Sequence, residues 1–398
     1  MSGLTAVSRE ELVSRARNLA DGIRERAGKA EQDRVVPSET YQEFKDAGLL
    51  RAFVPAAYGG YALDFSTVIE TSREIARVCG SSGWCLAIGT LHNGMVAGLP
   101  LAAQSDVFGP SEGNSVVCGV FMPGGTATVV EGGYRLTGTW DFASGCDHAS
   151  HALLAAAIRP GPEEKPVGIG NMLLRRDEFL IEDNWHVAGL AGTGSRRVRV
   201  EDAFVAQEFS NSGPGVFFEE HAASEASKRD GGFKGLPGNS VATLGLAGVP
   251  IGIAQGALEF FRERLAGKVR KATFRGPQDQ VAAQLRLAES AAEVDAVELM
   301  VLRDCEEMEQ TLMEGRAASL EQRGRYRRDA AYAFQTCAGA VSRLLPASGA
   351  QSIFRESPLQ RAVRDTQVMA THVVADWDMA RESYAKALLE LPIQDPVF

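Results

Sequence analysis

The spacing of hydrophobic residues changes twice along the chain. Up to about residue 115, apolar residues recur three and four positions apart, over residues 10–34 and again over 66–93, which predicts helices. From residue 116 the runs become short and strand-like: ATVVEGGYRLTG turns at Gly132-Gly133, and HALLAAAI, GNMLLRR and RRVRVEDAFV continue the pattern. We therefore predict an N-terminal helical domain over residues 1–115 and a middle β domain over residues 116–210.

The remainder of the chain returns to helical spacing. Residues 206–240 are rich in Gly, Ser and charged residues, which predicts a flexible loop. Four stretches with an apolar face follow, over residues 244–272, 281–315, 326–349 and 368–390. We assign residues 211–398 to a C-terminal four-helix bundle that carries the loop, so the expected fold class is mainly α with a small β domain.

Composition excludes several classes of protein. The 398 residues carry a net charge of −10 without a long basic cluster, which argues against nucleic-acid binding. The amino-terminal residues lack the apolar run of a signal peptide and no transmembrane-length run follows, so we expect a cytoplasmic protein away from membranes. Six Cys form no C-x-x-C pair and six His show no metal-ligand spacing, so we expect buried thiols and no metal.

Well-known catalytic motifs are missing from the sequence. It has no G-x-G-x-x-G after a strand, no Walker loop and no G-x-S-x-G elbow. A nicotinamide cofactor bound by this chain is therefore not expected.

Several segments resemble acyl-CoA dehydrogenases in the same order along the chain. They are a helix opened by Pro37 that ends near Gly48-Leu49-Leu50, the stretch 246–255, and Arg361 with Arg364-Asp365 after residues 347–350. The resemblance covers essentially the whole chain. It implies amino-terminal helices, a middle β-barrel or sandwich, and a carboxy-terminal four-helix bundle.

The catalytic carboxylate of such dehydrogenases is not found where the resemblance places it. The dehydrogenases need a Glu to remove the α-proton of a thioester. The two matching positions are Val373 and the segment Val241-Ala242-Thr243, and neither carries a carboxylate. A dehydrogenase-like oxidoreductase is therefore the weaker alternative.

Two longer stretches resemble the two-component flavin-dependent monooxygenases that share this fold. They are residues 138–150 (GTWDFASGCDHAS) and 185–195 (WHVAGLAGTGS), to which His92 and His372 add. The resemblance implies an oxygenase component that takes reduced FMN or FAD from a separate NAD(P)H:flavin reductase. It would use O2 through a C4a-hydroperoxide to hydroxylate a small aromatic or phenolic substrate, as a homotetramer or at least a dimer. An N- or S-oxygenase on the same scaffold is the alternative.

The resemblance also implies roles for individual residues around the flavin. Ser144 would bond flavin N5, with Phe142 and Trp140 beside the ring, and His372 would be the general base for a phenol. His92 would hydrogen-bond the substrate or the hydroperoxide. A strand-end turn at Ser144 and packing roles for both histidines are the alternatives.

Four further residues are expected to contact the ribityl or phosphate groups of the flavin. They are Thr193 and Ser195 in a glycine-flanked turn, and Arg270 and Arg361, the first across a subunit boundary. Gln367 departs from the His that the secosteroid-phenol hydroxylase of this family carries there, so the substrate of that member does not carry over.

Overall fold

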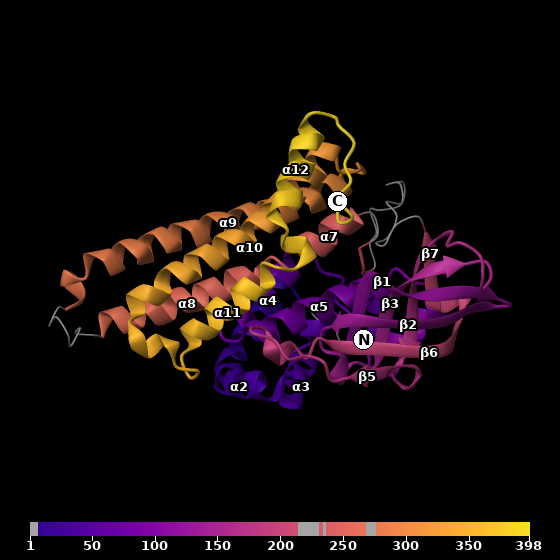
Figure 1. Cartoon of the computed structure of the whole chain (residues 1–398), viewed down its shortest axis with the longest axis horizontal. Helices are drawn as coiled ribbons and strands as arrows, with labels where there is room; N and C mark the ends of the chain where they lie inside the picture. The colour runs from indigo at the N-terminus through magenta and orange to yellow at the C-terminus, as the bar shows by residue number, and fades with distance from the viewer. Residues whose placement is uncertain (1–6, 214–230, 234–235, 268–275) are drawn as a thin grey trace, which may run out of the picture.

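The computed structural model describes residues 7–213, 231–233, 236–267 and 276–398 (Figure 1). Helices fill the chain up to Phe108, and the stretch expected over residues 10–34 divides at Leu19, which serves as the C-cap of one helix and the N-cap of the next. The helices of this part are α1 (Arg9–Asn18), α2 (Ala20–Asp33), α3 (Ser38–Asp46), α4 (Ser66–Ala76), α5 (Gly80–Val96) and α6 (Leu101–Phe108).

The middle part of the chain forms a seven-stranded sheet in the order β5-β6-β2-β1-β3-β4-β7. The hairpin expected at Gly132-Gly133 joins β1 to β2, with Val130 paired to Gly133, and β1 and β3 run parallel. The last strand extends to Gly213, past the expected boundary at residue 210, and most of the expected loop lies outside the described residues. The strands are β1 (Val117–Val130), β2 (Gly133–Ala143), β3 (His151–Arg159), β4 (Gly168–Arg175), β5 (Leu180–Glu182), β6 (Arg196–Ala206) and β7 (Ser210–Gly213).

Long helices of the third part lie beside one another and away from the sheet (Figure 1). The single helix expected over residues 368–390 is wrong: α11 ends at Met369, and α12 begins at Trp377 because the Asp376 carboxylate accepts the Met379 N–H at 2.9 Å and caps it. The turn between them carries His372. The helices are α7 (Gly238–Leu244), α8 (Gly248–Ala266), α9 (Val281–Met313), α10 (Leu320–Ser348), α11 (Pro358–Met369) and α12 (Trp377–Leu388).

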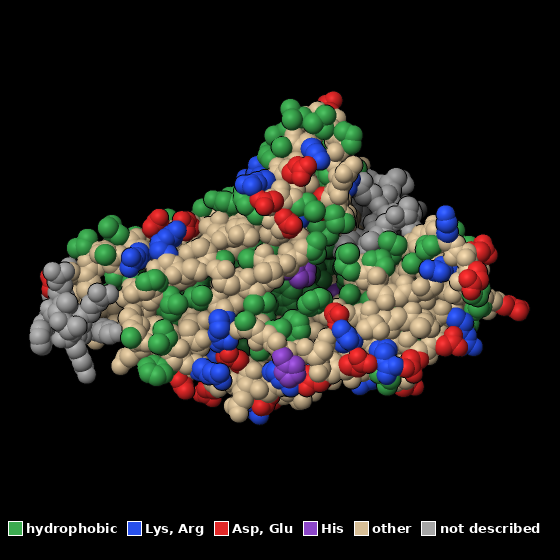
Figure 2. All heavy atoms as spheres, in the orientation of Figure 1, with side chains coloured by type: hydrophobic (Ala, Val, Ile, Leu, Met, Phe, Trp, Pro, Cys, Tyr) green, Lys and Arg blue, Asp and Glu red, His purple; other side chains and the backbone are tan. Residues whose placement is uncertain are grey.

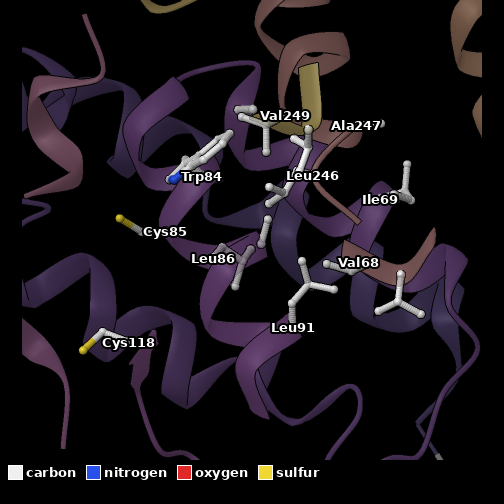
Figure 3. Packing of buried hydrophobic residues seen from close by; sticks show 14 of the residues in the cluster. Val68, Ile69, Trp84, Cys85, Leu86, Leu91, Cys118, Leu246, Ala247 and Val249 are labelled. Atoms are coloured by element: carbon white, nitrogen blue, oxygen red, sulfur yellow. The ribbon is translucent and has the colours of Figure 1, made fainter. Parts of the chain in front are cut away.

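Helix α5 is the centre of the molecule, since it is buried on all sides apart from Ile88. It packs against α4, α8, β1 and the turn that follows Leu190. Figure 3 shows Trp84 and Leu91 of α5 facing residues of α4 and the start of α8. A side chain on α5 can therefore contact the sheet and the bundle at once.

The junction between sheet and bundle is hollowed, and hydrophobic side chains gather there around a histidine (Figure 2). The stretch Gly238–Ala266, which spans α7 and α8, is long and apolar enough to cross a membrane, but 83% of its most apolar part is buried inside the protein. That burial is typical of a core helix.

Candidate active site

A bulge at the end of β2 turns Phe142 out of the sheet. Trp140 pairs with Val198 and Ala143 with Arg196, so β2 has one residue more than β6 between these pairs. Phe142 takes a left-handed φ of 70° and is 68% exposed, and its ring meets the edge of Trp185 at a centroid distance of 6.0 Å. The bulge therefore presents a bare aromatic ring two residues before Ser144.

Three hydroxyl groups, which we call the hydroxyl relay, form a buried row behind that ring. Ser144 Oγ and Ser195 Oγ lie 2.7 Å apart, and Thr193 Oγ1 lies 2.7 Å from Ser195 Oγ. The row ends at the carbonyl oxygen of Leu190, which accepts from Thr193 Oγ1 at 2.8 Å. The structure thus brings together the three hydroxyl residues predicted for the site, although Ser144 lies about 50 residues before the other two.

The turn that carries Thr193 is fastened to the bundle. Leu190 has a left-handed φ of 53°, and its N–H donates to the Asp365 carboxylate of α11 at 2.6 Å. Its carbonyl also accepts from Trp185 Nε1 at 3.3 Å. Burial raises the pKa of Asp365 to about 6, against the opposing effects of the Leu190 N–H and of Arg361. Asp365 therefore connects α11 to the hydroxyl relay.

Trp84 of α5 joins the relay to the bundle. Its Nε1–H donates to Ser144 Oγ at 3.1 Å. The same indole meets the ring of His372 edge-on, at a centroid distance of 5.4 Å and an interplanar angle of 70°. Ser144 is predicted to contact the flavin and His372 the substrate, and a single side chain thus separates them.

His372 is held by the turn that follows it. Its Nδ1 accepts the Val374 N–H at 3.3 Å, which leaves the ring hydrogen on Nε2, and no partner of Nε2 is found among the described residues. Burial and then the charge of Arg327 lower the pKa of His372 to about 4. His372 is therefore neutral at pH 7, with Nε2–H as the free donor.

A buried arginine supports the His372 turn. Arg327 of α10 is 1% exposed, and its guanidinium donates to the carbonyls of Val374 at 2.7 Å and Val373 at 3.1 Å. Its Nε donates at 2.9 Å to the carboxylate of Asp395, in the segment after α12. One side chain of α10 thus fixes both the turn and the segment after α12.

His92 lies deeper, on α5. Its Nδ1 bonds the carbonyl of Val117 at 2.8 Å, so Nδ1 carries the hydrogen and Nε2 is an acceptor. It is 2% exposed, its ring meets Phe121 edge-on, and burial lowers its pKa to about 4. No hydrogen bond of a described residue joins His92 to the relay.

Of the other predicted residues, Trp140 and Arg361 form no hydrogen bond with the relay in the described part of the chain. Trp140 is 1% exposed, and its Nε1 donates to the carbonyl of Ala155 at 2.7 Å, so it packs inside the sheet rather than beside Phe142. Arg361 lines a cavity of about 40 Å³ together with Arg77 and Asp365. Arg270 lies outside the described residues.

Sequence reasoning missed Trp84 and Arg327, the two residues that join the parts of the site. Trp84 lies 60 residues before Ser144, so no local spacing pairs them. Arg327 stands in the run Arg325-Tyr326-Arg327-Arg328, which has the composition of a solvated helix face. The one available signal is that Arg327 shares a helix side with the apolar Ala331 and Phe334.

The positions of the dehydrogenase base carry no carboxylate in the structure either. Val373 lies in the one-turn helix after His372, and Val241 and Thr243 lie buried in α7. The carboxylate of Asp365, which is buried next to the relay, is occupied by the Leu190 N–H. Proton abstraction from a thioester therefore has no base at either place.

Comparison with known proteins identifies the family. The models named acyl-CoA dehydrogenase, N-terminal domain, and acyl-CoA dehydrogenase, C-terminal domain, match residues 8–105 and 244–377. The chain is 31% identical to the oxygenase component of the FADH(2)-dependent resorcinol hydroxylase of Rhizobium sp. (strain MTP-10005), over 96% of this chain and 94% of that protein. It is 32% identical to HsaA, the oxygenase subunit of a flavin-dependent monooxygenase of Mycobacterium tuberculosis, over 95% of both.

A solved structure agrees with these relatives. XiaF from Streptomyces sp., in complex with FADH2 and glycerol, superimposes with a TM-score of 0.91 and 26% identity over 97% of this chain and 96% of its own. The enzyme is thus a monooxygenase that depends on reduced flavin, and the word component in the relatives' names means that a separate protein supplies that flavin. The chain belongs to the family of flavin-dependent monooxygenase oxygenase components built on the acyl-CoA dehydrogenase fold.

Proposed function

We propose that this oxygenase component hydroxylates a small phenol, with reduced FAD or FMN delivered by an NAD(P)H:flavin reductase in the cytoplasm. The observation that carries the proposal is the convergence on Trp84, which donates to Ser144 on one side and contacts His372 on the other. The residue proposed to contact the flavin and the residue proposed to contact the substrate are thereby separated by one side chain. The names of the relatives support a phenolic substrate, since one is a resorcinol hydroxylase and another a p-hydroxyphenylacetate 3-hydroxylase.

The residues present fit a flavin ring. Phe142 offers an exposed aromatic face, held by left-handed backbone, two residues before the buried hydroxyl of Ser144. A flat ring that carries a polar edge needs this combination of one apolar and one polar contact. Thr193 and Ser195 stand behind Ser144 and support it. When bound, reduced flavin reacts with O2 and supplies the oxygen atom for insertion, while the buried surroundings of Ser144 exclude water.

His372 would meet the phenol oxygen. A general base needs an unprotonated nitrogen facing the substrate, but the unprotonated Nδ1 already accepts the Val374 N–H. The geometry favours the other role, in which the phenol loses its proton to water and Nε2–H donates to the resulting phenolate and stabilises that form of the substrate. Phenolate rings are more electron-rich than phenols, so this contact promotes attack on an electrophilic oxygen.

The test of this function is a reconstituted assay. The protein, a flavin reductase, NADH and O2 are mixed with resorcinol or with p-hydroxyphenylacetate, and the molecular masses of the products are measured by mass spectrometry. We expect a gain of one oxygen atom on at least one phenol, and no steady NADH oxidation when the reductase is left out. Steady NADH oxidation by the protein alone, or oxygen gained only by amine or sulfide probes, would contradict the proposal.

We also propose that the chain assembles as a homotetramer through α9. Leu285, Leu299 and Met313 are 65–70% exposed and lie fourteen residues apart, which places them on one side of the helix. Large apolar side chains in such a row indicate a covered surface. Light scattering should give a multiple of 42.6 kDa, and the double variant Leu285→Glu with Leu299→Glu should lower it. A parent mass of 42.6 kDa would contradict the assembly.

A further inference from the structure

The direction of every hydrogen bond in the hydroxyl relay follows from the carbonyl at its end. A hydroxyl has one hydrogen to donate and two lone pairs to accept. The Leu190 carbonyl can only accept, so the hydrogen of Thr193 is used there. Ser195 must therefore donate to Thr193, and Ser144 must donate to Ser195.

The other end is compatible with this direction. Trp84 Nε1–H can only donate, and it donates to Ser144 Oγ. Ser144 has then given its hydrogen to Ser195 and filled one lone pair. What remains on Ser144 Oγ is one lone pair and no hydrogen.

We propose that Thr193 is a specificity-determining residue, which fixes Ser144 as an acceptor and thereby makes the site select reduced over oxidised flavin. The inference rests on the proposed contact between Ser144 and flavin N5. Reduced flavin carries a hydrogen on N5 and can donate to the free lone pair of Ser144. Oxidised flavin carries a lone pair on N5. N5 and Ser144 Oγ are then both acceptors, so they cannot form a hydrogen bond.

The Leu190 end of the relay is held firmly enough to keep the hydrogen bonds pointing from Ser144 towards Leu190. The Leu190 carbonyl is aimed by two groups besides Thr193: the Asp365 carboxylate, which binds the Leu190 N–H at 2.6 Å, and Trp185 Nε1, which donates to the carbonyl at 3.3 Å. Ser144, Thr193 and Ser195 are all buried, so water does not compete for their hydrogens. Asp365 is accordingly a positioning residue for Ser144, acting through Leu190 and the relay.

Thr193→Val tests the direction because it keeps the shape of the side chain and removes the hydroxyl. Ser195 then has no partner at position 193 and can donate back to Ser144, which frees the hydrogen of Ser144 for N5 of oxidised flavin. Dissociation constants are measured for oxidised FAD and FMN by fluorescence, and for the reduced forms under anaerobic conditions. We expect the preference for reduced flavin to fall about two- to tenfold, the effect of one hydrogen bond.

Three further variants keep the test decisive. Thr193→Ser restores the hydroxyl and should restore the preference. Ser195→Ala interrupts the relay at its middle and should lower the preference as Thr193→Val does, which covers the case that the valine variant does not fold. Thr243→Val makes the same chemical change in α7, where the hydroxyl binds only backbone carbonyls, and should leave the preference as it is.

The outcomes separate this inference from the proposed function. If the parent binds reduced flavin and hydroxylates a phenol, but Thr193→Val and Ser195→Ala keep the parent preference, the relay does not set selectivity and the function stands. If the parent binds neither form of flavin, the function and this inference both fail.

Discussion

The two histidines next to the site, His92 and His372, share a lowered pKa of about 4 and differ in nearly everything else. His92 lies in the most buried helix and gives its Nδ1–H to the Val117 carbonyl, which leaves an acceptor. His372 lies in a turn between two helices and takes the Val374 N–H on Nδ1, which leaves a donor. Burial makes both rings neutral, but the backbone beside each ring decides which nitrogen carries the hydrogen. Their chemical roles are therefore set locally and are opposite.

The supports of the two histidines differ as well. The carbonyl that binds His92 belongs to the first residue of β1, so the whole sheet holds it. The turn of His372 depends on one buried ion pair, Arg327 with Asp395. We expect the second support to be the more vulnerable to substitution.

Arg327→Met should have the largest effect. It removes the donor to two carbonyls and leaves the Asp395 carboxylate buried without a counter-charge, which costs about 3–5 kcal/mol of unfolding free energy. The melting temperature reports the loss, and Arg381→Met, which breaks an exposed pair with Asp378, is the matched control. A melting temperature within the scatter of that control would show that the ion pair does not support the turn.

A fall in pH should lower the stability of the folded protein through His92. The unfolded chain binds a proton at His92 below its usual pKa of about 6.5, whereas the folded protein does so only below about 4. Stability from this group is therefore complete above pH 6.5 and is lost as the pH falls to 4, by about 3 kcal/mol at most. His92→Gln should flatten the melting temperature between these pH values; equal slopes for parent and variant would exclude the effect.

Substitutions at His372 distinguish a donor from a base. His372→Ala should lower hydroxylation about a hundredfold and release hydrogen peroxide in place of product. His372→Gln keeps an N–H near the position of Nε2 but cannot act as a base, so we expect it to retain far more product than alanine. Equal losses in both variants would favour the base. Parent rates in His372→Ala at all pH values would make the residue structural and favour an N- or S-oxygenase.

Trp84→Phe should have the smallest effect. It keeps a ring against His372 and removes the hydrogen bond to Ser144, worth about 1 kcal/mol. We expect reduced flavin to bind a few-fold more weakly, by anaerobic titration, with the pH dependence of hydroxylation unchanged. A changed pH dependence would mean that Trp84 acts on His372 instead.

The sequence predicted the elements better than the connections between them. Periodicity placed the hairpin of β1 and β2, the strands β3, β4 and β6, and most helices, because one face of each element packs on the core. It missed the short strands β5 and β7. It joined residues 368–390 into one helix because apolar spacing continues through the turn. Asp376, a good N-cap before Trp377, was the available sign of the break.

The predicted site was incomplete for a physical reason. Ser144, Thr193 and Ser195 entered through motifs that are continuous in sequence, and His372 was added to them as a single residue. Trp84 and Arg327 act through contacts made only after folding, between side chains or backbone groups 46 or more residues apart. The acceptor state of Ser144 depends on the Leu190 carbonyl, and a backbone group leaves no mark in the sequence.

Phe142 has a consequence for anyone who engineers this enzyme. A non-glycine residue in left-handed backbone is strained by about 1–3 kcal/mol, and an exposed aromatic ring recovers little of that by burial. Selection for heat resistance alone would thus favour Phe142→Gly and discard the ring proposed to hold the flavin. Libraries built for durability should keep this position fixed, because its instability and its usefulness have the same origin.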